Sequence, residues 1–238
     1  MSFLTAEWRK LAIANYVVDP SLLREYIPYG TELDLYNNKC YVSLVGFMFI
    51  NTKLLGFKIP FHSNFEEVNL RFYVKHFDGK QWKRGVVFIK EIVPKPALSF
   101  IANTVYNENY ETLPMSHSWL SNDENLTIEY KWKKCNYWNK FKVIADLEPT
   151  KIEEGSETEF ITEHYWGYAK VNDQHTNEYE VTHPKWLKYN IIRSEIDVNF
   201  DETYGEKFSF LNQTKPISIM LAEGSEITVE NKRKLKKS

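Results

Sequence analysis

The chain has 238 residues, a formal net charge of −2 and 26% charged residues, so its overall charge gives no attraction for nucleic acid. No apolar segment approaches the roughly 20 residues of a membrane-spanning helix, and the N-terminus has no basic region followed by an apolar run. We therefore expect a cytoplasmic protein with no membrane or nucleic-acid partner.

Aromatic residues make up 16% of the chain, and tyrosine and tryptophan suit strands, pockets and interfaces. A homodimer is compatible with this aromatic content. The two isolated cysteines, Cys40 and Cys135, make neither a disulfide framework nor a metal knuckle, so free thiols are expected. In a cytoplasmic protein, the glycosylation-like triplets at Asn125 and Asn212 are chance matches.

The first periodic segment predicts a short helix at residues 20–27. Asp19 is a typical N-cap, Pro20 suits the first turn, and Pro28 ends the segment. The largely apolar run at residues 40–50 predicts a strand.

Residues 67–74 alternate between two kinds of side chain. Val68, Leu70, Phe72 and Val74 point one way, and the polar residues point the other: Glu67, Asn69, Arg71 and Tyr73. Such a polar row is typical of a pocket or of a mutually paired interior. We expect Glu67, Asn69 and Arg71 to face the interior, although an ion pair on an exposed face is an equally good interpretation of the pattern.

The remaining pattern is mostly strand. A second helix is predicted at residues 96–105, and further strands are predicted at 85–91, 127–132, 140–145, 159–171, 178–182, 194–200 and 217–222. Residues 1–222 are predicted to form one domain, and residues 223–238 a basic, disordered C-terminal tail. The predicted fold class is mainly β (α+β), an antiparallel β-barrel with a few helices, because closure removes exposed strand edges.

No standard catalytic or cofactor motif is present. The six histidines show no metal-ligand spacing, the nine glycines are scattered, and no nucleophile elbow occurs. We expect no metal and no cofactor. His164 and His183 remain candidate site residues, although a lone histidine in a strand is more often structural.

Several segments together resemble a bacterial family of unknown function, the YqjF-like family, which is grouped with the acetoacetate decarboxylases. The matching segments are Trp8-Arg9, Asn15-Tyr16-x-Val18-Asp19-Pro20, Glu67-Val-Asn-Leu-Arg71-x-Tyr-Val74, Arg84-Gly-Val-x-Phe88, Phe160-Ile-Thr-Glu-His-Tyr165 and His183-Pro-x-Trp186. This resemblance implies an acetoacetate decarboxylase-like barrel with a ligand-sized lumen. It also aligns Glu67 with a catalytic-site glutamate, and Arg9-Lys10-Leu11 with an Arg-Glu-Tyr run that precedes the first helix in those enzymes.

The resemblance fails at the catalytic lysines. Acetoacetate decarboxylases carry a lysine pair, and one lysine forms a Schiff base with the substrate ketone. Here the corresponding positions fall near Asn109 and Tyr110, which cannot form an imine. Lys90 and Lys95 are the nearest alternatives, and neither has a lysine beside it.

Two classes of function therefore remain open, and whether the protein is an enzyme is undecided. The first is binding of a small anionic organic molecule in the barrel lumen without Schiff-base decarboxylation. The second is a self-associating interaction protein with an internally paired polar core. A cavity of several hundred Å³ would favour the first, and a filled lumen the second. The candidate ligand-binding residues are Arg9, Glu67, Asn69, Arg71, Tyr106, His164 and His183.

Overall fold

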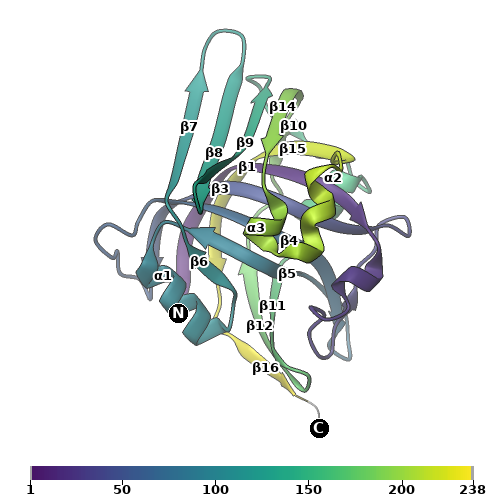
Figure 1. Cartoon of the computed structure of the whole chain (residues 1–238). Coiled ribbons are helices and arrows are strands. Elements are labelled where there is room, and N and C mark those ends of the chain that lie inside the picture. The colour runs from purple at the N-terminus through teal and green to yellow at the C-terminus, as the bar shows by residue number, and fades with distance from the viewer. Residues whose placement is uncertain (1, 237–238) are drawn as a thin grey trace.

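The computed structural model describes residues 2–236, and residues 1, 237 and 238 lie outside the described part. Strands dominate, as predicted, and fall into two sheets (Figure 1). Among the described residues, no helix is long and apolar enough to span a membrane.

Seven strands of the larger sheet form a closed ring. Their order is β15-β1-β3-β4-β5-β11-β12, and an additional pairing of β12 with β15 closes the path, with Val181 opposite Val229. The strands are β1 (Leu4–Val18), β3 (Cys40–Leu54), β4 (Phe65–Phe77), β5 (Trp82–Val93), β11 (Trp166–Asn172), β12 (His175–Thr182) and β15 (Ser218–Val229). We call these strands the ring.

The ring is mixed rather than wholly antiparallel. β11 runs parallel to β5, with Trp166 opposite Gly85, whereas the other neighbours in the ring are antiparallel. The parallel pair arises because the second sheet lies between β5 and β11 in the chain, which replaces a short hairpin by a long connection.

Short strands extend the larger sheet. These are β2 (Glu32–Leu33), β6 (Tyr110–Thr112), β10 (Thr150–Lys151), β13 (Leu187–Tyr189) and β16 (Arg233–Lys236). β16 pairs with β12, and β15 continues to Val229, so the predicted disordered tail is wrong for residues 223–236. The run of basic residues there, from Lys232 to Lys236 with only Leu235 between them, also suits a solvated tail. Residues 237 and 238 of the predicted tail lie outside the described part.

The second sheet packs on the outside of the ring. Its order is β14 (Ile191–Asp197), β9 (Tyr137–Ala145), β8 (Leu126–Lys134) and β7 (Met115–Ser121). The strands predicted at 127–132 and 140–145 are present as β8 and β9, which pair as an antiparallel hairpin. Trp132 and Phe141 point inward from this hairpin and share one apolar cluster with Leu70 and Phe72 of β4. Burial of these large side chains stabilises the docking of the two sheets.

The helical segments are short. They are a 3-10 turn at Pro20–Leu23, α1 (Pro96–Ile101), a π-helical turn at Ala102–Tyr106, α2 (Glu157–Thr162), α3 (Phe200–Tyr204) and a 3-10 helix at Glu206–Asn212. The predicted first helix is therefore one turn, capped by Asp19, whose Oδ1 accepts from Ser21 N at 2.8 Å. The predicted second helix is present as α1 and the π-helical turn.

The predicted strand at residues 159–171 is wrong in its first part. Ser156 caps α2, with its Oγ accepting from Glu159 N at 3.2 Å, and Glu159 Oε2 accepts from Gly155 N at 2.7 Å. This Ser-x-x-Glu arrangement resembles a capping box, although Glu159 reaches the amide of Gly155 rather than that of Ser156, and it starts a helix where amphipathic alternation favours a strand. The strand begins only at Trp166, in β11.

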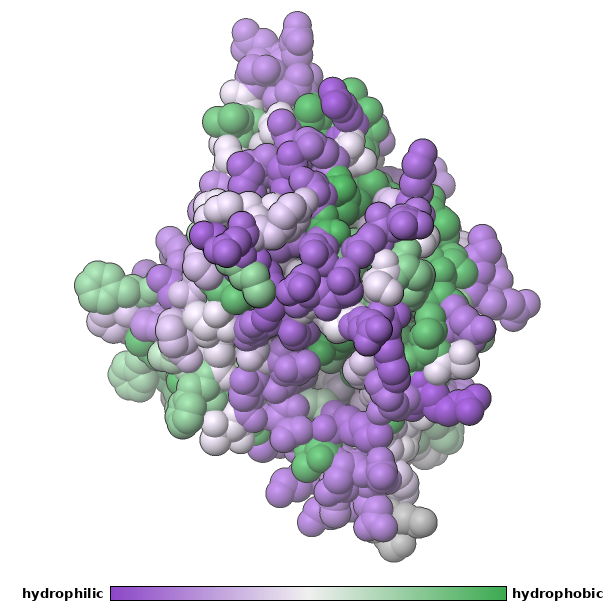
Figure 2. Space-filling view, viewed as in Figure 1, coloured by the Kyte–Doolittle hydropathy of each residue, from purple (hydrophilic) through white to green (hydrophobic). Residues whose placement is uncertain are grey.

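Both cysteines are free thiols, as predicted, with Cys40 buried and Cys135 exposed. On the face drawn in Figure 2, hydrophilic residues run across the middle and separate the hydrophobic areas toward the sides. The outer part of the molecule carries single exposed aromatic residues, among them Phe61 and Phe57 in the segment between β3 and β4.

Candidate functional site

A cavity of about 140 Å³ lies inside the ring. Every strand of the ring contributes to its lining, and α1 with the π-helical turn covers one side through Leu98, Ile101 and Tyr106. This volume is smaller than the several hundred Å³ expected for a ligand-binding lumen, but side chains do not fill the interior. We call it the ring cavity.

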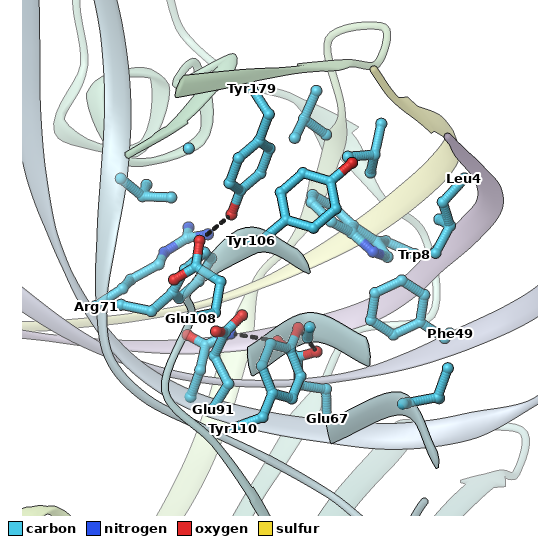
Figure 3. A pocket seen from close by; sticks show the side chains of 18 of the residues that line it. Leu4, Trp8, Phe49, Glu67, Arg71, Glu91, Tyr106, Glu108, Tyr110 and Tyr179 are labelled. Carbon is cyan, nitrogen blue, oxygen red and sulfur yellow. Dashed lines mark hydrogen bonds between the residues drawn. The ribbon is translucent and has the colours of Figure 1, made fainter. Parts of the chain in front are cut away.

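The ring cavity has an apolar side and a polar side. Figure 3 shows Leu4, Trp8 and Phe49 together on one side, and the carboxyl groups of three glutamates gathered on the other. These glutamates are Glu67, Glu91 and Glu108, which we call the carboxyl cluster. A small molecule with an apolar part and a polar end matches this division.

The polar row of β4 faces this cavity. Glu67, Asn69 and Arg71 are buried and line it, whereas Val68, Leu70 and Phe72 belong to the apolar cluster outside the ring. This is the orientation that the period of two predicts. The fourth polar residue of the row, Tyr73, is also buried and hydrogen-bonds through its hydroxyl to Ser43 Oγ at 2.7 Å.

Hydrogen bonds hold Glu67 at both carboxyl oxygens. Asn69 Nδ2 donates to Oε1 at 2.9 Å, and the Tyr110 hydroxyl donates to Oε2 at 3.1 Å. Burial raises the pKa of Glu67 to about 7, while these bonds and the charge of Arg71 oppose the rise. The side chain therefore titrates near neutral pH.

The other two carboxyls also titrate above their ordinary range. Burial, with the neighbouring charges of Glu108 and Glu67, raises the pKa of Glu91 well above its ordinary value. Burial raises the pKa of Glu108 to about 7, although the Tyr179 hydroxyl donates to its Oε1 at 2.7 Å. Ionising all three carboxyls in one buried cavity would cost a large electrostatic free energy, so the cluster keeps part of its protons near neutral pH.

Several buried polar atoms in the cavity lack partners among the described residues. They are Arg71 Nε, Asn69 Oδ1, Glu91 Oε2 and His164 Nδ1. A polar core that only stabilises the fold is expected to satisfy such groups. The incomplete pairing therefore disfavours the interpretation of the polar row as an internally paired core.

Two further predicted residues lie at the same cavity. His164 lines it, with Nε2 at 3.2 Å from Asp34 Oδ2, and burial lowers the pKa of this histidine to about 4. It is therefore neutral at pH 7. Tyr106 also lines the cavity, and its hydroxyl donates to the backbone oxygen of Glu230 at 3.3 Å.

The prediction that Arg9 and His183 line the cavity with the other candidates is wrong, because both side chains lie outside it. Trp8 points inward from β1, and alternation turns Arg9 outward, where it pairs with Glu7 at 2.6 Å. His183 follows β12 and stacks on Trp186 at 4.3 Å between ring centroids, beside a separate surface depression.

No lysine of the described residues lines the ring cavity. Lys90 points away and pairs with Glu111 at 3.0 Å, and Lys95 precedes α1 without reaching the lining. At the position that corresponds to the lysine pair, Asn109 donates to the backbone oxygen of Ile89 at 2.7 Å and Tyr110 enters the cavity.

Sequence reasoning missed Glu91, Glu108, Tyr110 and Tyr179 as site residues. Glu91 lies within a largely apolar strand, with Ile92 and Val93 after it, and a carboxyl inside a buried strand was an available signal. Its position at the site follows from the pairing of β5 with β4, in which it lies opposite Asn69. Glu108 and Tyr110 follow the π-helical turn, and nothing in their local sequence indicates a cavity.

Comparisons with known proteins support a family and a fold. The model of the DUF2071 family, described as an uncharacterized conserved protein, matches residues 5–226. The uncharacterized protein YqjF of Bacillus subtilis (strain 168) is 28% identical over 199 residues, which cover 81% of this chain and 77% of YqjF.

Solved structures with the acetoacetate decarboxylase-like fold are similar to this chain. An acetoacetate decarboxylase-like enzyme from Sphingomonas wittichii RW1 has a TM-score of 0.67 at 10% identity, covering 100% of this chain and 95% of that one. The enduracididine biosynthesis enzyme MppR with HEPES bound has a TM-score of 0.68 at 10% identity, covering 99% of this chain and 89% of that one. Acetoacetate decarboxylase from Legionella pneumophila has a TM-score of 0.64 at 11% identity, covering 98% of this chain and 86% of that one. At these identities the likeness shows the fold alone.

Proposed function

The chain belongs to the DUF2071 family of uncharacterized conserved proteins, and we propose that this member binds a small monocarboxylic acid in the ring cavity without forming a Schiff base. The carboxylate lies at Arg71, and the apolar part lies against Trp8 and Phe49.

The observation that carries this proposal is the state of Arg71. The residue is 8% exposed and lines the cavity, its Nε has no hydrogen-bond partner, and no ion pair among the described residues includes it. A buried guanidinium without an anion is costly, and a carboxylate matches its planar set of donors. A bound carboxylate therefore satisfies a group that the folded chain leaves unsatisfied.

The size and lining of the cavity limit the ligand. A cavity of roughly 150 Å³ admits a molecule of benzene size, and the volume here is about 140 Å³. Short acids such as butyrate and pyruvate are no larger than benzene. Their hydrocarbon part is expected to contact the aromatic side of the cavity, where Figure 3 shows Trp8 and Phe49.

The lining of the cavity also argues against imine chemistry. Schiff-base formation requires a neutral primary amine beside the bound carbonyl. Among the described residues the cavity offers carboxyl, phenol, amide, imidazole and guanidinium groups and no lysine amine. One structural neighbour, the enzyme MppR, has been solved in complex with pyruvate, which supports a small oxo acid as a ligand to test here.

Calorimetric or NMR titration with butyrate and with the uncharged analogue butyramide tests the proposal. We expect butyrate to bind and butyramide to bind at least about tenfold more weakly, since a hydrogen bond to a charged group contributes about 1.5–3 kcal/mol. Arg71→Gln should weaken butyrate binding by about 10- to 100-fold on the same grounds. Arg9→Gln is the matched control, because Arg9 lies outside the cavity, and should leave the affinity unchanged.

Equal binding of butyrate and butyramide, or equal effects of the two arginine substitutions, would contradict a carboxylate site at Arg71. Borohydride reduction in the presence of pyruvate or acetoacetate, followed by intact-mass measurement, tests the absence of an imine. A stoichiometric adduct on one lysine would overturn that part of the proposal.

A further inference from the structure

Two members of the carboxyl cluster meet around one tyrosine. In the strand pairing, Glu91 lies opposite Asn69 of β4 on one side and beside Tyr110 of β6 on the other. Glu67 is two residues from Asn69 on the same face of β4, and its Oε2 accepts from the Tyr110 hydroxyl. Figure 3 shows Glu67, Tyr110 and Glu91 side by side at the polar end of the cavity.

The two carboxyls differ in what surrounds them. Glu67 receives a hydrogen bond at each oxygen, which favours its ionised form. Glu91 Oε2 has no partner among the described residues, and burial together with two neighbouring carboxyls raises the pKa of Glu91 well above its ordinary value. Glu67 therefore ionises first, while Glu91 keeps its proton. Paired carboxyls of unequal environment are the arrangement that separates an acid from a base.

Arg71 is an independent sign that the cluster faces a ligand. It lies on the same face of β4 as Glu67, four residues further along the strand, and is buried with an unpartnered Nε at the cavity. An acid held by its carboxylate at Arg71 is confined to a cavity of about 140 Å³ that both the aromatic side chains and the carboxyl cluster line, so its remaining atoms lie between the two and within reach of the cluster.

We propose that Glu67 and Glu91 act as general base and general acid that enolise a small 2-oxo acid held at Arg71. This inference rests on the proposed function, because the acid must first bind in the ring cavity. Glu67 and Glu91 are the catalytic residues, and Asn69 and Tyr110 are positioning residues that orient the Glu67 carboxylate.

The proposed step needs no external reactant. A Glu67 oxygen removes a proton from the carbon next to the oxo group, and the electron pair of that C–H bond forms the C=C bond of the enol. The π pair of the carbonyl moves to its oxygen, which takes the proton of the Glu91 carboxyl. Glu67 is then protonated and Glu91 ionised, and the reverse step returns a proton to carbon. Nothing is oxidised or reduced, and no bond to the protein forms.

Deuterium exchange into pyruvate tests the step. Pyruvate is incubated with the protein in D₂O, and the loss of the methyl proton signal is followed by NMR against a buffer blank. We expect exchange well above the blank. Glu67→Gln should lower the rate by about 100-fold or more, and Glu91→Gln by at least about tenfold, in line with the contribution of general acid–base groups. Glu66→Gln is the matched control, because Glu66 neighbours Glu67 but is not part of the cavity lining, and should not change the rate.

A pyruvate titration under the same conditions separates the two proposals. No binding of pyruvate would contradict the proposed function and this inference together. Saturable binding without exchange above the blank would overturn the inference alone. Exchange that survives Glu67→Gln, or that is accompanied by a borohydride-trapped lysine adduct, would also overturn it.

A second variant covers the case in which Glu67→Gln does not fold. Tyr110→Phe keeps both carboxyls and removes only the hydroxyl that donates to Glu67. We expect it to lower the exchange rate and to move the alkaline-rising limb of the pH–rate profile to higher pH, because the Glu67 carboxylate loses a donor. An unchanged profile in this folded variant would contradict the assigned role of Glu67.

Discussion

Relative to the unaltered protein, replacing Glu67 by glutamine should stabilise the fold much more at pH 8 than at pH 5. The folded-state pKa of Glu67 is about 7, compared with an ordinary value of 4.5. The native state therefore binds this proton more tightly than the unfolded state. The stability linked to Glu67 is fully present below about pH 4.5 and is lost as the pH rises through about 7. Glutamine has no such loss.

The expected size follows from the shift. A rise of the pKa from 4.5 to about 7 corresponds to roughly 3 kcal/mol over the whole range, and most of it falls between pH 5 and pH 8. Urea unfolding followed by tryptophan fluorescence at several pH values measures it. The free energy of unfolding of Glu67→Gln minus that of the unaltered protein should grow by this amount from pH 5 to pH 8.

The neighbouring residue provides a control of opposite sign. Burial acts to raise the pKa of Glu66, but the hydrogen bond and charge of His117 outweigh it, and the pKa lies below its ordinary value. Glu66 therefore adds stability above its unfolded-state pKa, and Glu66→Gln should become less stable, relative to the unaltered protein, as the pH rises from acid to neutral. Parallel pH curves for Glu67→Gln and the unaltered protein would refute the burial of an ionisable Glu67.

Three further predictions concern the cavity and the C-terminal strand. Trifluoroacetate stays anionic across this pH range, and its affinity in ¹⁹F NMR titrations should fall as the pH rises through about 7, because Glu67 and Glu108 become charged there. An affinity that does not change with pH would contradict a ligand beside these carboxyls. Gly167→Ala should weaken butyrate binding and lower the free energy of unfolding in urea by about 1–3 kcal/mol. The reason is that a Cβ at Gly167 would overlap the Tyr179 ring, whose hydroxyl donates to Glu108. Unchanged affinity would exclude Tyr179 from the site. Backbone amides within Arg233–Lys236 that bond to β12 should exchange slowly with D₂O, and uniformly fast exchange would support the disordered tail instead.

Local periodicity predicted the polar side of the cavity because the signal lies within one strand. Glu67, Asn69 and Arg71 alternate with large apolar residues, and both faces of β4 are buried, so one register satisfies the whole pattern. The resemblance to a known family added the fold, which the strand pattern alone does not specify.

The other half of the site depends on long-range pairing that no local pattern encodes. Glu91 reaches the cavity because β5 pairs with β4, and Glu108 and Tyr110 reach it through the turn after α1. Arg9 shows the opposite error: its alignment suggested the lumen, but the inward position of Trp8 turns it outward. At α2, the N-cap hydrogen bond of Ser156 and the bond from Gly155 N to Glu159 start a helix in spite of an alternation that favours a strand.

The most direct test of the account is a crystal structure of the protein with pyruvate at saturating concentration. We predict pyruvate inside the ring cavity, with its carboxylate oxygens within hydrogen-bond distance of the Arg71 guanidinium and no covalent bond to any lysine. The account would be contradicted by a cavity closed by side chains, by pyruvate bound only elsewhere, or by continuous density between pyruvate and a lysine.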